Sequence, residues 1–163
     1  DLLEVITKLT TGRDMAGIEL DGAPDFTMGS FISPAVIGTV QQELEALEAR
    51  NQAGAGFFVT PPVFDLNSFK GFMKHLEDKP VKIIPNVLLL KSVGMARAID
   101  LHMNHVHMPA DLIQRLKKAP DRVRECVQIA RELIAAVKEA GYAGVMISPL
   151  GWEDRLPGIL EGV

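Results

Sequence analysis

Cysteine is almost absent from the sequence, which has a single one, Cys126, among 163 residues. One cysteine cannot form a disulfide within the chain, so a disulfide-stabilised scaffold is excluded. The helical pattern that surrounds it, RVRECVQIARELIAAVKEAG, favours a buried thiol in a reducing, cytoplasmic setting.

Long apolar runs and a basic leader are also missing. No run approaches the roughly 18 apolar residues that a membrane span needs, so we expect no membrane partner. The first residues, DLLEVITKL, follow a helical pattern and lack an initiating methionine. We therefore expect a fragment or a processed portion of a longer protein.

Positive charge is not concentrated anywhere in the chain. The formal net charge is −4, and the lysines and arginines are scattered. Because a nucleic-acid partner requires a cluster of cations for its phosphate backbone, we expect no nucleic-acid binding.

The composition is that of a globular domain, with 47% apolar and 23% charged residues. A complete barrel of eight strands and eight helices typically needs about 250 residues, so this chain is too short for one. We expect a single domain over residues 1–163.

Strands and helices are expected to alternate. Short apolar runs bounded by turn residues predict buried strands at residues 26–33, 56–60, 81–90 and 143–150. Apolar residues at helical spacing predict helices at residues 1–10, 39–54, 65–76, 92–103, 109–119 and 121–140. Thr39 is expected to cap the second of these, with Gln42 as its capping-box partner.

Proline lies within or directly after each predicted strand. Pro34 and Pro149 follow the first and last strands, Pro61 and Pro62 follow GFFVT, and Pro85 lies inside the third strand. Since proline has no amide hydrogen, we expect the strands to end or to be interrupted at these positions.

The alternation predicts an α/β fold of parallel β/α units. Four such strands could belong to an open doubly wound sheet or to an arc, one half, of a TIM barrel, which is the fold we predict. An arc leaves two unpaired edges. We therefore expect it to be completed by the missing barrel half or by a homo-oligomer partner.

An ordered set of motifs resembles a known family. An acid-rich helix is followed by AGA, a strand, TPPVFD and a helix, and then by IIPNVLLLKSVGMARAI, HVHMPADLIQRL and GWEDRLPGIL. Each motif is weak alone. Their order along nearly the whole chain is similar to that of the methylenetetrahydrofolate reductases, which are TIM-barrel flavoproteins, and implies strands five to eight of that barrel.

The resemblance also implies a reaction. In the family, a nicotinamide donor reduces bound FAD, and the flavin passes a hydride to methylenetetrahydrofolate. The family's catalytic glutamate and aspartate would precede Asp1, so no catalytic residue is predicted within the chain. Where the family has a glutamine that reaches the folate, this chain has Pro61, which has no polar side chain.

Three residues around the end of the 39–54 helix are cofactor candidates by this resemblance. Arg50 matches the position of a cation that meets the flavin phosphates. Glu43 shares its helix face, and the small Ala55 would let the helix pack close to the next strand. A solvated arginine, an exposed helix acid and simple packing are the alternatives.

Three residues near strand ends are substrate candidates. Thr60 and Phe64 flank the prolines at the carboxyl end of a strand, where barrel enzymes place their sites. Lys91 follows the third strand and could meet an anionic tail such as a folate glutamate, with a plain surface lysine as the alternative.

Three histidines, His102, His105 and His107, lie at short spacing. No cysteine or carboxylate set accompanies them, so we predict no metal site.

Two other functions stay open. A degenerate barrel subunit that had lost flavin or folate could serve as a structural or docking component of a redox complex, and Pro61 favours this reading. An unrelated phosphate-handling barrel enzyme would instead have an anion site on the loops after the last two strands.

Overall fold

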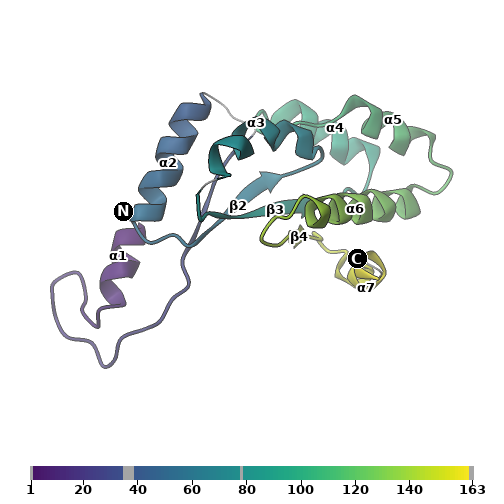
Figure 1. Cartoon of the computed structure of the whole chain (residues 1–163). Coiled ribbons are helices and arrows are strands. Elements are labelled where there is room, and N and C mark those ends of the chain that lie inside the picture. Colours follow the sequence, from purple (N-terminus) through teal and green to yellow (C-terminus); the bar gives the residue numbers. More distant parts are fainter. Residues whose placement is uncertain (1, 35–38, 78, 162–163) are drawn as a thin grey trace.

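A four-stranded parallel sheet forms the centre of the computed structural model, which describes residues 2–34, 39–77 and 79–161. Its strands are β1 (Gly29–Phe31), β2 (Phe57–Pro62), β3 (Lys82–Leu88) and β4 (Met146–Ser148), in that spatial order (Figure 1). A doubly wound sheet reverses its strand order at a switch point, whereas a barrel arc adds each strand beside the last. The sequential order confirms the predicted α/β class and fits an arc.

Helices connect the strands in the predicted sequence. They are α1 (Leu2–Leu9), α2 (Val40–Gln52), α3 (Lys70–Met73) between the short 3₁₀ turns Leu66–Phe69 and Lys74–Leu76, α4 (Val93–His102), α5 (Ala110–Lys118), α6 (Arg122–Glu139) and α7 (Leu156–Leu160), the last preceded by a 3₁₀ turn at Glu153–Arg155. Helix α7 was not predicted. None of the described helices is long and apolar enough to cross a lipid bilayer.

Local capping explains where the helices begin. The Thr39 hydroxyl accepts a hydrogen bond from the Gln42 amide, and the Gln42 side chain accepts one from the Thr39 amide, which confirms the capping box. The Ser92 and Asp121 side chains cap α4 and α6 by accepting hydrogen bonds from the amides of Met95 and Arg124. The start points of these helices therefore follow from local sequence.

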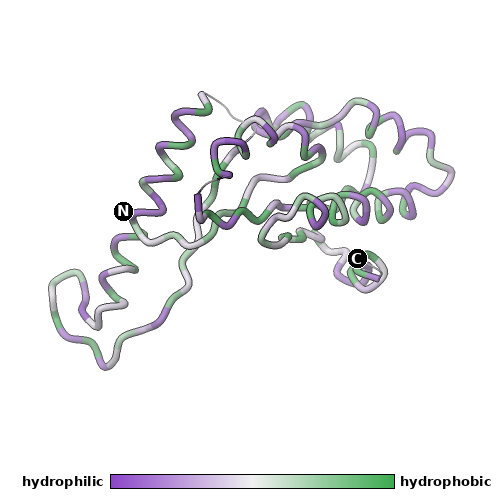
Figure 2. Tube along the Cα trace, viewed as in Figure 1, coloured by the Kyte–Doolittle hydropathy of each residue, from purple (hydrophilic) through white to green (hydrophobic). Residues whose placement is uncertain are grey.

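One face of the sheet is covered by the connecting helices. Phe58 and Ile83 are buried in a cluster with Leu47 of α2 and Phe72 of α3. A second cluster joins Val87 to α6. In Figure 2 the central strands are mostly green, while α5 and α6 alternate between green and purple along their length. The core thus lies between the sheet and this helical layer.

The opposite face is much less covered. The strand register places Phe31, Val59 and Ile84 side by side, and Met146 lies beside Asn86 on the same face. Phe31 is 70% exposed, and Val59, Ile84 and Met146 are only partly buried. In a closed barrel this concave face would be the interior.

The expectation that prolines end the strands was wrong for β2, whereas Pro85 interrupts the regular pairing of β3 as expected. Strand β2 continues through Pro62, and Pro85 lies inside β3. The register changes between the pairs Val59–Ile84 and Pro62–Asn86, so one extra residue of β2 forms a bulge opposite Pro85. The missing amides of the prolines fall within this irregularity, and a regular pairing is not required there. The first strand is also shorter than predicted, with only three residues.

Candidate functional site

The carboxyl ends of all four strands lie at one edge of the sheet because the strands are parallel. We call this edge the rim. It carries Ser33 after β1, Phe64 after β2, Lys91 after β3 and Leu150 after β4. Ligands of open and closed parallel α/β folds bind at this end, so the predicted residues are assessed by their places along the rim.

Glu43 and Arg50 of α2 meet at the β1 end of the rim. A Glu43 carboxylate oxygen accepts a hydrogen bond from the Ser33 amide at 2.6 Å, and Arg50 Nη1 donates to the Phe31 carbonyl at 2.6 Å. Arg50 Nη1 and Glu43 Oε1 are 3.9 Å apart. The structure therefore brings two of the three predicted cofactor residues together.

These contacts also affect the open edge of β1. The Met28 carbonyl and the Ile32 amide bond to β2, so the alternate backbone groups of Phe31 and Ser33 face away from β2. Glu43 accepts a hydrogen bond from one of these groups, the Ser33 amide, and Arg50 donates one to another, the Phe31 carbonyl. The α2 pair thus covers the carboxyl end of an edge that a further strand would use.

A groove of about 660 Å³ lies beside Arg50, between α1 and the outer edge of β1. Its lining is mainly apolar and includes Leu2, Phe26, Phe31 and Ile6. A guanidinium can bind phosphate, the group by which FAD would meet Arg50. The role of Arg50 as a cofactor contact stays a prediction.

Ala55 lies in the core, and its role in cofactor binding stays a prediction. It is 2% exposed and packs with Leu47 and Phe58 in the core beneath α2. Its position matches the packing alternative.

Thr60 is enclosed in the sheet at 1% exposure. Its hydroxyl donates to the Pro61 carbonyl at 2.8 Å and accepts from the backbone amide of Asn86 at 3.2 Å. Beside it, the Ser148 hydroxyl donates to the Asn86 side-chain oxygen at 2.9 Å. The Thr60 hydroxyl thus takes the place of a backbone acceptor at the bulge.

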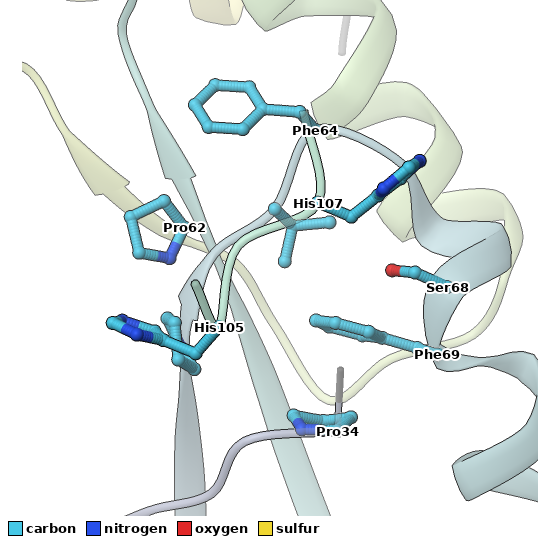
Figure 3. A pocket seen from close by; sticks show the side chains of 9 residues that line it. Pro34, Pro62, Phe64, Ser68, Phe69, His105 and His107 are labelled. Carbon is cyan, nitrogen blue, oxygen red and sulfur yellow. The ribbon is translucent and has the colours of Figure 1, made fainter. Parts of the chain in front are cut away.

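Phe64 is also buried, at 4% exposure, in a cluster with residues of α4, α5 and α6. A small hollow adjoins it, with His105 and His107 on different sides and Phe69 and Pro34 beneath (Figure 3). The cavity volume is about 10 Å³, which is room for one water molecule. The β2 part of the rim is therefore filled by side chains.

His105 and His107 line this hollow from different sides. His107 Nε2 lies 4.0 Å from Asp65 Oδ2, and the Asp65 side chain caps the following 3₁₀ turn. Within the described ranges, no group of three or more histidine, cysteine, aspartate or glutamate side chains could hold a metal ion.

Lys91 lies at the other end of the rim, where β3 and β4 finish. Its ammonium donates to the Leu150 carbonyl and lies 5.8 Å from the centroid of the Trp152 ring. Hydrogen bonds from the Glu153 and Gly151 amides, with a smaller contribution from Lys91, lower the pKa of the Glu153 carboxyl. Sequence reasoning did not identify Leu150, and the proline and glycine that flank it in PLGW were the available signal for a tight turn.

The sequence profile of the family described as methylenetetrahydrofolate reductase matches residues 1–162. The chain belongs to this family. No curated protein matches it significantly.

Among solved structures, this methylenetetrahydrofolate reductase family chain is similar to an uncharacterized protein from Clostridium thermocellum that binds two copies of 5-methyl-5,6,7,8-tetrahydrofolic acid. The TM-score is 0.55 and the identity 17%. The match covers 85% of this chain and 53% of the other, so the chain spans about half the length of that protein. At this identity the likeness concerns the fold.

Proposed function

We propose that the chain is the second half of a (β/α)₈ barrel, within one domain over residues 1–163, in a cytoplasmic folate-dependent reductase. The reaction is hydride transfer from a nicotinamide through FAD to methylenetetrahydrofolate. The observation that carries this proposal is the match of the family profile to residues 1–162. The common rim of four parallel strands and the folate bound by the structural neighbour support it.

Arg50 is the residue we propose for the FAD phosphates, with Glu43 orienting it. Their mutual distance of 3.9 Å and the contact of Arg50 with the Phe31 carbonyl at the rim support this role. When bound, FAD supplies the hydride chemistry, whereas Arg50 supplies charge and position. Ala55 would act only through the packing of α2, and Thr60 and Phe64 would shape the rim from within the core rather than contact the folate directly.

The partner that completes the site is the missing barrel half, and we propose that it adds a strand beside β1. The uncovered groove holds Leu2 and Phe26, which are 71% and 52% exposed, and Phe31 projects from the concave face. Large apolar side chains in one exposed region are typical of an interface. The match to 53% of the structural neighbour supports a partner of similar size.

Binding of folate and flavin tests the proposal directly. The protein is titrated calorimetrically with 5-methyltetrahydrofolate and, separately, its visible absorbance is recorded after incubation with FAD. We expect saturable binding of both, and weaker FAD binding in Arg50→Ala than in the control Arg97→Ala, an exposed arginine of α4. The proposal would be refuted if the barrel, completed by its other half, showed neither flavin absorbance nor a heat of folate binding.

A second function is favoured by the filled β2 rim. Pro61 stands where the family has a folate-binding glutamine, and the adjoining cavity holds about one water molecule. A subunit that keeps the barrel but has lost its ligands would act as a structural or docking component of a redox complex. It predicts a colourless protein that still associates with its barrel partner.

A further inference from the structure

The turn after β4 has an unusual backbone. Leu150 has a φ of 50° and Gly151 a φ of 86°, and the Trp152 amide donates to the Pro149 carbonyl at 3.2 Å. Two consecutive left-handed residues closed by this hydrogen bond resemble a type I′ turn, whose first central position favours asparagine, aspartate or glycine. Among the described residues, Leu150 is the only non-glycine residue with a positive φ.

Contacts from a distant strand hold this strained turn. Lys91, three residues after the end of β3, donates to the Leu150 carbonyl and faces the Trp152 ring. A glycine is favoured between them, because any other residue at position 151 would adopt a strained φ. We call Lys91, Leu150 and Trp152 the Lys91 latch.

Leu150 of the latch is exposed at the rim, whereas Trp152 packs partly against the core. Leu150 is 55% exposed although it is apolar, and Trp152 is half-buried. Residues held in unfavourable backbone regions concentrate at ligand clamps, because the surrounding structure has to maintain them against their own preference. An exposed apolar side chain and a half-buried indole two residues apart suit the face of a flat heteroaromatic ring.

The Lys91 ammonium is directed at the turn. It is already bonded to a carbonyl, and the Glu153 carboxylate lies close enough to interact with its charge. Both reduce the availability of Lys91 for an anionic ligand.

We propose that Lys91 is a positioning residue, which holds Leu150 and Trp152 as an apolar wall for the ring of a flat heteroaromatic ligand. The apolar wall does not depend on the proposed function, whereas the identification of the ring as a pterin rests on that function. In this proposal Lys91 acts by holding the turn, whereas the prediction from the sequence was a direct contact of Lys91 with a folate glutamate tail.

The latch can be tested without ligand, because Trp152 is the only tryptophan. Acrylamide quenching of its fluorescence and hydrogen exchange of the Trp152 amide are compared in wild type, Lys91→Met, Lys91→Arg and the exposed-lysine control Lys118→Met. Loss of a partly exposed cation–π contact corresponds to about two- to fivefold faster exchange in Lys91→Met. We expect Lys91→Arg to restore most of the protection and Lys118→Met to match wild type. Equal quenching and exchange in Lys91→Met and wild type would overturn the proposal.

Two ligands separate positioning from direct contact. The tri-γ-glutamate form of 5-methyltetrahydrofolate carries an anionic tail, and 6-methyltetrahydropterin has none. Positioning predicts that Lys91→Met weakens both by a similar factor, whereas a loss confined to the glutamate form would overturn it. If the wild-type protein binds neither ligand, the proposed folate function is refuted. The role of Lys91 in holding the turn is then tested by the fluorescence quenching and hydrogen exchange alone.

Discussion

Glu43 and Arg50 hold neighbouring backbone groups of one strand end: Glu43 accepts from the Ser33 amide at 2.6 Å, and Arg50 donates to the Phe31 carbonyl at 2.6 Å. The two side chains come from the same face of α2, seven residues apart. Together they link α2 to the end of β1. The Arg50 guanidinium therefore makes a structural contact and is also the group proposed to bind the ligand.

Replacing Arg50 by alanine should therefore lower stability as well as FAD binding. A hydrogen bond from a charged donor contributes about 1.5–3 kcal/mol, and partial exposure of Arg50 places the expected loss at about 1 kcal/mol. Urea unfolding of Arg50→Ala and Arg97→Ala measures it. Equal unfolding midpoints for both variants would mean that the contact with Phe31 contributes no stability.

Gly29 should not tolerate a side chain. A Cβ added there would overlap the ring of Phe57, the residue paired with it on β2. Because the ring would have to move within the sheet, we expect Gly29→Ala to destabilise the protein by about 1–3 kcal/mol, as overpacking does.

A matched glycine provides the control for this substitution. Gly71 lies in α3, and a Cβ there would meet nothing within 4 Å. Alanine is favoured over glycine in a helix by about 1 kcal/mol, so Gly71→Ala should be neutral or stabilising in the same urea titration. A Gly29→Ala variant as stable as Gly71→Ala would contradict the predicted overlap. Phe57→Leu in the Gly29→Ala background should recover part of the loss.

Much of the fold could be predicted from local sequence. The capping box at Thr39 and Gln42 depends on residues three positions apart, and the parallel α/β class follows from strands that alternate with helices. The strand bounds were less predictable, because Pro85 and Pro61 are tolerated only through a bulge formed with the neighbouring strand. That pairing is a tertiary property.

The candidate site was predictable only in part. The proximity of Glu43 and Arg50 follows from helical spacing, since residues seven apart share a face. The Lys91–Leu150 contact joins residues 59 positions apart, and its significance depends on the left-handed φ of Leu150, for which leucine gives no signal. Thr60 was a reasonable rim candidate, but its hydroxyl is used by the bulge.

Cys126 should be nearly unreactive in the folded protein. It is 1% exposed, and burial raises the pKa of its thiol to about 11, with a smaller contribution from the neighbouring Glu125 carboxylate. Since the thiolate is the nucleophile, alkylation by iodoacetamide at pH 8 should be at least about 100-fold slower than in the urea-unfolded chain, whose thiol has an ordinary pKa near 8.5. Mass spectrometry of timed samples measures both rates. Similar rates in the two states would contradict burial of the thiol.

Arg115 of α5 should make stability depend on pH through Glu132 of α6. Arg115 Nη2 donates to Glu132 Oε1 at 2.9 Å, and this hydrogen bond lowers the pKa of the Glu132 carboxyl below its ordinary value. A lowered folded-state pKa means that the stabilisation is fully present above the unfolded-state value, near 4.3, and is lost as the pH falls through the folded value. Because the Glu132 side chain is 47% exposed, we expect less than about 1 kcal/mol.

The test compares urea midpoints at pH 6 and pH 3 for wild type, Glu132→Gln and Glu139→Gln, an exposed α6 control. Wild type and Glu139→Gln should lose more stability between the two pH values than Glu132→Gln, whose side chain does not titrate. Added salt should narrow the difference at pH 6, because an exposed ion pair is screened. If all three proteins lose the same stability on acidification, the Arg115–Glu132 pair does not join α5 to α6 energetically, and apolar packing around Leu116 and Ile129 carries that contact by itself.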